Sequence, residues 1–176
     1  MKISKTDLAD LLVIELKIHH DARGFFIERY HKDLYKELGL DINFVQDNHS
    51  RSVANVIRGL HYQTNPSQGK LVGVIRGKIL DVAVDLRPNS SSFGKYFSIE
   101  LSDKNTKLMW IPAGFAHGFA NIGDSDADVI YKVDNHYNPN GDHGIRFDDP
   151  DLNIDWRVKN PIISDKDLKL PSFRRL

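Results

Sequence analysis

The sequence has 176 residues, of which 40% are hydrophobic and 27% are charged, and its formal net charge at pH 7 is zero. That length suits one domain with a sizeable core, and the balanced charge gives no support to nucleic-acid binding, which needs a clustered cationic surface. Any anionic partner should therefore be small. The absence of cysteine excludes disulfides, thiolate zinc sites and cysteine nucleophiles. Residues 1–16 show neither a signal-peptide pattern nor a membrane-spanning run, so we expect a cytoplasmic protein with no membrane partner.

Short segments rich in β-branched and aromatic residues, bounded by turn-forming residues, predict strands along most of the chain. They are residues 25–30, 44–52, 55–63, 70–76, 78–87, 96–102, 107–112 and 127–133. One helix is predicted at 32–38, where Gly39 provides the stop, and the polar tail at 160–176 is expected to run as extended chain over the surface. Many strands without alternating helices favour an all-β jelly-roll sandwich or barrel, here one domain over residues 1–176.

The segment KILDVAVDLR, residues 78–87, has aliphatic side chains on one face of its strand and Asp81 and Asp85 on the other. A solvated outer face is the ordinary interpretation of such acids. The alternative is a barrel interior, where buried carboxylates need partners. His61 and Lys70 are candidate partners.

The segment PAGFAHGFAN, residues 112–121, has the form P-x-G-x-x-H-x-x-x-N. It resembles the second sequence motif of the cupin jelly rolls, in which the histidine, here His117, usually binds a metal. The first cupin motif normally supplies H-x-H and a glutamate, but in residues 58–77 Gln63 replaces the second histidine and Lys70 replaces the glutamate. Lysine offers only donors and a positive charge, so it would repel a divalent cation. We therefore predict no metal, with an ammonium group in its place.

Seven blocks of sequence occur in an order that resembles one cupin family closely, over nearly the whole chain. They are FVQDNHSRS (44–52), RGLHYQ (58–63), QGKLV (68–72), DVAVDLR (81–87), WIPAGFAHGF (110–119), FDDPDLNIDW (147–156) and SDKD (164–167). Together they are similar to the dTDP-4-dehydrorhamnose 3,5-epimerases. The resemblance implies a metal-free, cofactor-independent homodimeric isomerase that inverts C3 and C5 of dTDP-4-keto-6-deoxyglucose, giving the 4-keto precursor of L-rhamnose.

Both C3 and C5 lie next to the C4 ketone, so either proton can leave with formation of an enolate, which needs a base, an oxyanion stabiliser and an acid. An imidazole titrates near the working pH, so His61 suits the base. The resemblance pairs His61 with Asp167, which would fix its tautomer. It also assigns Lys70 to the developing oxyanion and Tyr131 to the acid on the opposite face of the ring.

Substrate binding needs cations for a diphosphate and flat surfaces for a base. The resemblance assigns Arg23 and Arg58 to the phosphates and sugar, and a planar guanidinium suits phosphate oxygens. It assigns Phe26 and Tyr137 to the thymine. Further residues match polar neighbours of the base or line the cavity: Glu28, Gln46, Asn48 and His117. In the family the DARGFF strand, residues 21–26, crosses to the partner subunit, so a monomer is expected to have an incomplete site. Asp81 is left between a structural role and orientation of His117 or Lys70.

Taken singly, these residues have ordinary interpretations, such as a structural histidine, a solvated lysine or, for Asp167, a solvated acid. The joint pattern favours the epimerase. A metal-dependent cupin oxygenase or isomerase is disfavoured by Gln63 and Lys70. A non-catalytic sugar-nucleotide-binding cupin would be expected to lack one of His61, Lys70 or Tyr131. Relatives that invert only C3 or only C5, or accept a modified sugar, share the same base and cation and stay open.

Overall fold

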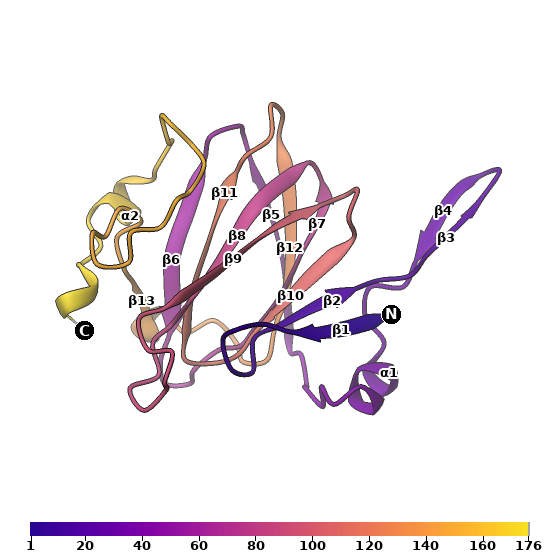
Figure 1. The fold of residues 1–176 in the computed structure, drawn as a ribbon, viewed down its shortest axis with the longest axis horizontal. Helices are drawn as coiled ribbons and strands as arrows, with labels where there is room; N and C mark the ends of the chain where they lie inside the picture. The colour runs from indigo at the N-terminus through magenta and orange to yellow at the C-terminus, as the bar shows by residue number, and fades with distance from the viewer. Residues whose placement is uncertain (176) are drawn as a thin grey trace.

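The computed structural model describes residues 1–175, whose regular structure is mainly antiparallel strand in two facing sheets (Figure 1). In spatial order the six-stranded sheet comprises β1 (Lys2–Lys5), β2 (Leu12–Glu15), β10 (Lys107–Ile111), β7 (Lys70–Arg76), β12 (Ala127–Val133) and β5 (Gln46–Ser52). The five-stranded sheet comprises β13 (Asp142–Gly144), β6 (Ile57–Gln63), β11 (Phe115–Asn121), β8 (Lys78–Asp85) and β9 (Tyr96–Ser102). This arrangement confirms the all-β, jelly-roll class.

A hairpin and a few short helical segments complete the fold. The hairpin pairs β3 (Ile18–Asp21) with β4 (Gly24–Ile27) and projects away from the two sheets (Figure 1). The helical segments are α1 (Lys32–Glu37), α2 (Asp165–Leu168) and the 3-10 turns Pro139–Gly141 and Phe173–Arg175. The hairpin and α1 lie at the opposite side of the molecule from the C-terminal segment (Figure 1).

Alternation of side chains along the strands fills the space between the sheets. Val72 and Val74 of β7, in one sheet, join Ile79 of β8 and Phe119 of β11, in the other, in one buried cluster. The outer face of the five-stranded sheet is also covered, because the C-terminal segment packs on it. The first of these clusters holds the two sheets together, and a second one joins the C-terminal segment to the outer face.

Strand β8 is buried on both faces, so the interpretation of its acids as a solvated outer face is wrong. Leu80 and Val82 pack under Trp156 of the C-terminal segment on the outer side. Asp81 and Asp85 lie on the inner side, and each is 0% exposed. The alternative of a barrel interior is the one that the structure shows.

Most predicted strands match observed ones, and three do so residue for residue: β7, β9 and β12. The strand predicted at 25–30 is wrong beyond Ile27, where β4 ends. The helix predicted at 32–38 is α1, with Leu38 as its C-cap.

The prediction of an extended tail at 160–176 is wrong where α2 and the last 3-10 turn form, and Leu176 lies outside the described residues. The cause of α2 is local. The Ser164 side chain accepts a hydrogen bond from the Asp167 N–H at 3.1 Å, which satisfies a backbone donor at the helix start. This bond fixes one helical turn within the polar C-terminal tail.

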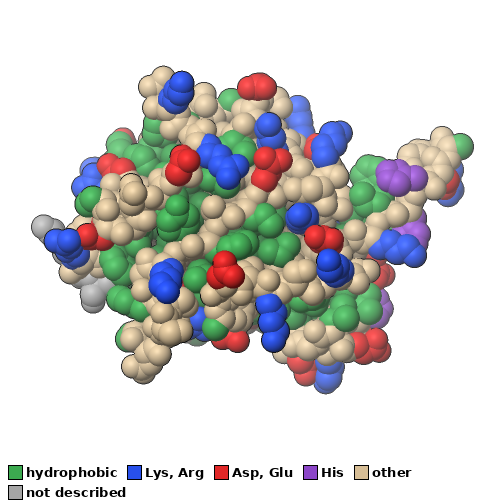
Figure 2. All heavy atoms as spheres, in the orientation of Figure 1, with side chains coloured by type: hydrophobic (Ala, Val, Ile, Leu, Met, Phe, Trp, Pro, Cys, Tyr) green, Lys and Arg blue, Asp and Glu red, His purple; other side chains and the backbone are tan. Residues whose placement is uncertain are grey.

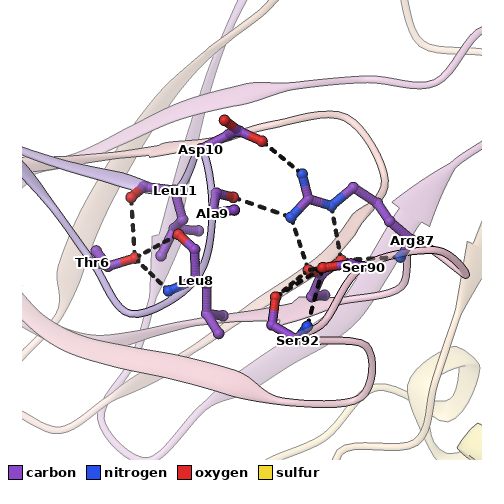
Figure 3. Close-up of polar contacts among 9 residues, drawn as sticks. Thr6, Leu8, Ala9, Asp10, Leu11, Arg87, Ser90 and Ser92 are labelled. Carbon is purple, nitrogen blue, oxygen red and sulfur yellow. Dashed lines mark hydrogen bonds and ion pairs between the residues drawn. The ribbon is translucent and has the colours of Figure 1, made fainter.

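Arg87 connects the loop between β1 and β2 to the end of β8 (Figure 3). Its Nε and Nη2 donate to the two carboxylate oxygens of Asp85 at 2.9 and 2.8 Å, and its Nη1 donates to Asp10 at 2.9 Å. Ser90 and Ser92 each donate to Asp85 Oδ2 at 2.6 Å. Through these bonds the buried carboxylate has the partners that burial requires.

Basic and acidic side chains are interspersed on the face shown in Figure 2, in keeping with a net charge of zero. The hairpin arm stands clear of the rest of the molecule on the same view. Across residues 1–175, none of the helices has the length and hydropathy that a bilayer crossing requires.

Candidate active site

A cavity of about 750 Å³ lies among strands of both sheets and the C-terminal segment. Nine of the residues predicted for the site line it: Gln46, Asn48, Arg58, His61, Lys70, His117, Tyr131, Tyr137 and Asp167. The structure therefore brings together side chains that are up to 121 positions apart in sequence, from 46 to 167.

His61 and Asp167 form a hydrogen-bonded pair at the cavity wall. His61 Nε2 lies 2.8 Å from Asp167 Oδ1, and Asp167 Oδ2 accepts from the Gly59 N–H at 3.1 Å. Burial raises the pKa of the Asp167 carboxyl, but the bonds from His61 and Gly59 outweigh it and leave the pKa below its ordinary value. An ionised Asp167 accepts the Nε2 proton, so Nδ1 of the neutral His61 ring is left as a proton acceptor.

Lys70, on β7, places its ammonium group in the same cavity. It is 8% exposed, and its Nζ donates to the His61 carbonyl at 3.3 Å. Burial lowers the pKa of Lys70 to about 8, because a low dielectric disfavours the charged form, and nearby carboxylates, led by Asp142 and Asp81, oppose that effect. The ammonium is therefore poorly solvated and available to an anionic ligand.

Tyr131 reaches the cavity from the other side. It lies on β12 of the six-stranded sheet, whereas His61 lies on β6 of the five-stranded sheet. Burial raises the pKa of the Tyr131 phenol, so it is protonated at neutral pH, although the nearby Arg58 acts in the opposite direction. The protonated Tyr131 phenol and the His61 imidazole thus approach the cavity from opposite sheets.

Three of the residues predicted for the nucleotide are linked by hydrogen bonds at the cavity. Gln46 Nε2 donates to Asn48 Oδ1 at 2.8 Å, and Gln46 Oε1 accepts from the Tyr137 N–H at 3.0 Å. Arg58 donates to Ser52 Oγ at 2.9 Å. The Tyr137 side chain is 54% exposed, so its ring is accessible for stacking.

Three predicted residues, Arg23, Phe26 and Glu28, lie on or just after the projecting hairpin and do not line this chain's cavity. Phe26 is 68% exposed. Arg23 pairs with Asp21 at 2.5 Å, with its side chain 90% exposed. The hairpin therefore presents a bare aromatic ring and a cation away from the body of the molecule.

Sequence reasoning missed two charged residues at the cavity, Asp142 and Lys166. Asp142 Oδ2 accepts from Lys166 Nζ at 2.6 Å and from the Tyr137 hydroxyl at 3.1 Å. The sequence signals for both were weak: Lys166 adjoins Asp167 within the SDKD block, and Asp142 follows Tyr137 by five residues.

The residues at the positions of the cupin metal ligands do not fit a metal. Gln63 uses its amide on backbone groups: Nε2 donates to the carbonyls of Pro66 and His136, and Oε1 accepts from the Asn138 N–H. Lys70 supplies a positive charge where a carboxylate would be needed. Within residues 1–175, no three or more His, Asp or Glu side chains gather in a way that could hold a metal ion.

Fold and site together define a cupin-type sandwich in which a histidine–aspartate pair and a buried lysine occupy the cavity. A family model described as dTDP-4-dehydrorhamnose 3,5-epimerase matches residues 5–175. The chain belongs to this family.

Named relatives agree over nearly the full chain. An epimerase of this name from Methanothermobacter thermautotrophicus is 49% identical, over 93% of this chain and 89% of its own, and one from Shigella flexneri is 45% identical, over 98% and 96%. The crystal structure of a Legionella pneumophila dTDP-6-deoxy-D-glucose-3,5-epimerase with dTDP-4-keto-L-rhamnose matches with a TM-score of 0.95 and 43% identity, over 98% of this chain and 93% of that one.

Proposed function

We propose that this protein epimerises dTDP-4-dehydro-6-deoxy-D-glucose at C3 and C5 to dTDP-4-dehydro-L-rhamnose, in dTDP-L-rhamnose biosynthesis. Family membership supports the activity. The observation that carries the mechanism is the 2.8 Å His61–Asp167 pair, which faces the same cavity as Lys70 and Tyr131. The chemistry moves only protons, with no net transfer of electrons, so it calls for no redox cofactor.

His61 acts as the base. Its Nδ1 takes the proton from C3 or C5, and the C–H electron pair moves into the ring to form an enolate with the charge on O4. Asp167 stabilises the resulting imidazolium through Nε2–H. The Lys70 ammonium is placed to neutralise the O4 charge, and its burial strengthens that interaction because little water competes with it.

Tyr131 acts as the acid. Its hydroxyl gives a proton to the same carbon from the side opposite His61, which inverts the configuration and regenerates the ketone. The raised pKa of this buried phenol keeps it protonated until an enolate forms. Solvent or a relay of hydroxyls then restores the Tyr131 proton, and His61 loses its extra proton.

The nucleotide is held by both chains of a homodimer. Within one chain, Arg58 faces the diphosphate, Gln46 and Asn48 contact the thymine, and Tyr137 stacks on it. The partner's hairpin would supply the residues that this chain's cavity lacks: Arg23, Phe26 and Glu28. Two exposed features support this arrangement, the bare aromatic rings of Phe25 and Phe26, which are 64% and 68% exposed.

The proposed location is the cytoplasm, and residues 1–176 are proposed to act as one catalytic domain. The location is supported by the cysteine-free sequence. Fractionation of cells that produce the tagged protein tests it.

The activity is tested by incubating the protein with dTDP-4-dehydro-6-deoxy-D-glucose in deuterated water and following C3 and C5 by NMR. We expect deuterium at both carbons and a product inverted at both. Exchange and inversion confined to one carbon would identify a mono-epimerase. Binding of the nucleotide sugar without any exchange would show a non-catalytic module.

A further inference from the structure

Two histidine–carboxylate pairs lie side by side in the cavity wall, and the proposed mechanism uses one of them. His61 of β6 and His117 of β11 are directly opposed in the antiparallel register, and both line the cavity. Opposed residues on antiparallel strands point to the same face, with Cβ atoms about 4.5–5.5 Å apart. His117 Nε2 lies 2.7 Å from Asp81 Oδ1, just as His61 contacts Asp167.

Asp81 is difficult to explain as a part of the core alone. It is 0% exposed, and within the described chain its Oδ2 is a buried oxygen without a hydrogen-bond partner. Burial raises the pKa of Asp81, whereas the charge and hydrogen bond of His117 and the charge of Lys70 act to lower it. A buried carboxylate with an unmet oxygen destabilises a fold more than an apolar side chain of similar size would. Asp85, four residues further along β8 and on the same face, has every carboxylate oxygen bonded. Of these two acids, Asp81 is the one with an unbonded oxygen, and its partner His117 lines the cavity.

We propose that Asp81 is a positioning residue of the epimerase site: as an ionised carboxylate it holds His117 with Nδ1 toward the sugar and supplies negative charge that keeps Lys70 an ammonium. This inference rests on the proposed function for its role in catalysis. Its two structural claims, the protonation of His117 on Nε2 and the positive charge on Lys70, can be tested without measuring enzyme turnover.

The orientation of His117 follows from the bond to Asp81. An imidazole that donates Nε2–H to a carboxylate has a lone pair on Nδ1. His117 Nδ1 forms no hydrogen bond to the described residues, although the ring lines the cavity. A neutral His117 therefore presents an acceptor, which suits a hydroxyl of the sugar beside the carbons that react.

The effect on Lys70 follows from the charges around it. The ionisable groups that act on the Lys70 ammonium or share its cavity are Arg58, His61, Asp81, His117, Tyr131, Asp134, Tyr137, Asp142, Lys166 and Asp167. Burial lowers the pKa of Lys70 to about 8, and Asp142, Asp81 and Asp134 each act to raise it. Asp81 of β8 and Asp142 of β13 belong to the sheet opposite Lys70, whereas Asp134 directly follows β12 of the lysine's own sheet, so the ammonium receives negative charge from both sides.

The test uses ligand-free protein and NMR. Protein labelled with ¹³C in lysine is titrated while the Lys70 ¹³Cε signal, assigned by its loss in Lys70→Arg, is followed. We expect a midpoint near pH 8 in the wild type, and in Asp81→Asn a midpoint lower by roughly half a unit or more. Asp85→Asn is the matched control, since it removes an equally buried aspartate of β8, and it should leave the Lys70 midpoint unchanged.

A second measurement needs no variant. Long-range ¹H–¹⁵N spectra of the wild type at neutral pH should show His117 protonated on Nε2 and bare on Nδ1. A proton on Nδ1 with a bare Nε2 would mean that Asp81 is protonated and donates, which overturns the proposal. An unchanged Lys70 midpoint in folded Asp81→Asn, or an equal shift in Asp85→Asn, overturns it as well. If the protein proves not to be an epimerase, the Lys70 titration and the His117 spectrum should still be as expected. Failure of this inference is therefore distinguishable from failure of the proposed function.

Discussion

At the scale of single residues, the proposed mechanism depends on which nitrogen of the His61 ring faces the sugar. Asp167 accepts from His61 Nε2 and is itself fixed by the Gly59 N–H, so the ring cannot rotate without losing a buried bond. Nδ1 is thereby the proton acceptor. The neighbouring Lys70 Nζ, bonded to the His61 carbonyl, places its charge beside the same ring.

Replacing His61 by Asn should remove exchange at both C3 and C5, because one base serves both carbons. Loss of a general base lowers the rate by a factor of roughly 10² to 10⁴. The measurement is deuterium incorporation by NMR, with dTDP affinity by calorimetry as the control, and we expect that affinity to stay close to wild type. Near-normal exchange at either carbon would show that another group removes that proton.

Replacing Tyr131 by Phe separates the acid from the base, since the ring and its packing remain while the donor is lost. Proton removal by His61 should continue, but the enolate would be reprotonated by solvent or by the imidazolium on its original face. We expect inversion to fall further than deuterium incorporation, most clearly at C5. Equal loss of inversion and exchange would make Tyr131 a binding residue.

The sequence predicted those site residues that lie in strands or in family blocks, such as His61 and Tyr131. Asp142 was missed because β13 has only three residues and shows no period of two, and Lys166 was missed because only Asp167 of the SDKD block was given a role. The pairing of His117 with Asp81 was only one of the alternatives, since strand order decides which diagonal neighbours meet.

At the scale of elements, alternation predicted the strands but not what covers them. The two faces of β8 were distinguished correctly, yet their environments could not be assigned, because the segment that covers Leu80 and Val82 lies at 145–173 in the sequence. The sequence did not predict the helix α2 either. Its Ser164 cap is a local signal, but one turn is too short to show a helical period.

The Arg87–Asp85 cluster at the end of β8 should contribute measurably to stability. Asp85→Asn should lower the free energy of unfolding by about 2–4 kcal/mol at pH 7, since it breaks a buried, fully bonded ion pair. Arg146–Asp148 has the same spacing and bidentate contacts but is exposed, with both side chains 46% exposed. Asp148→Asn is therefore the control, and urea unfolding should show little change in it.

The same cluster predicts a pH dependence. Burial raises the pKa of Asp85, but bonds from Arg87, Ser90 and Ser92 outweigh it and hold the pKa below its ordinary value. Because the pKa of Asp85 is lower in the folded protein than in the unfolded chain, its stabilising contribution is complete above the unfolded-state pKa of about 3.9. That contribution is lost as the pH falls toward the folded-state pKa. The difference between wild type and Asp85→Asn should therefore shrink below about pH 4. A constant difference down to pH 2 would contradict this assignment.

At the scale of the whole molecule, the proposed dimer makes each active site a product of two chains. His61→Asn and the double variant Arg23→Ala/Phe26→Ala should each be inactive alone. When the two are refolded together, half of the dimers combine one of each, and each such dimer has one intact site, so roughly a quarter of wild-type activity should return. If both sets of residues serve the same chain's site, mixing restores nothing.

The central claim is that proton abstraction at C3 and C5 depends on side chains and not on a metal. The most direct measurement is deuterium exchange into dTDP-4-dehydro-6-deoxy-D-glucose by wild-type protein before and after exhaustive treatment with a chelator. We predict that exchange at both carbons continues at an unchanged rate, because Gln63 and Lys70 occupy the positions of metal ligands. Exchange that is abolished by the chelator and restored by one divalent ion would contradict the account.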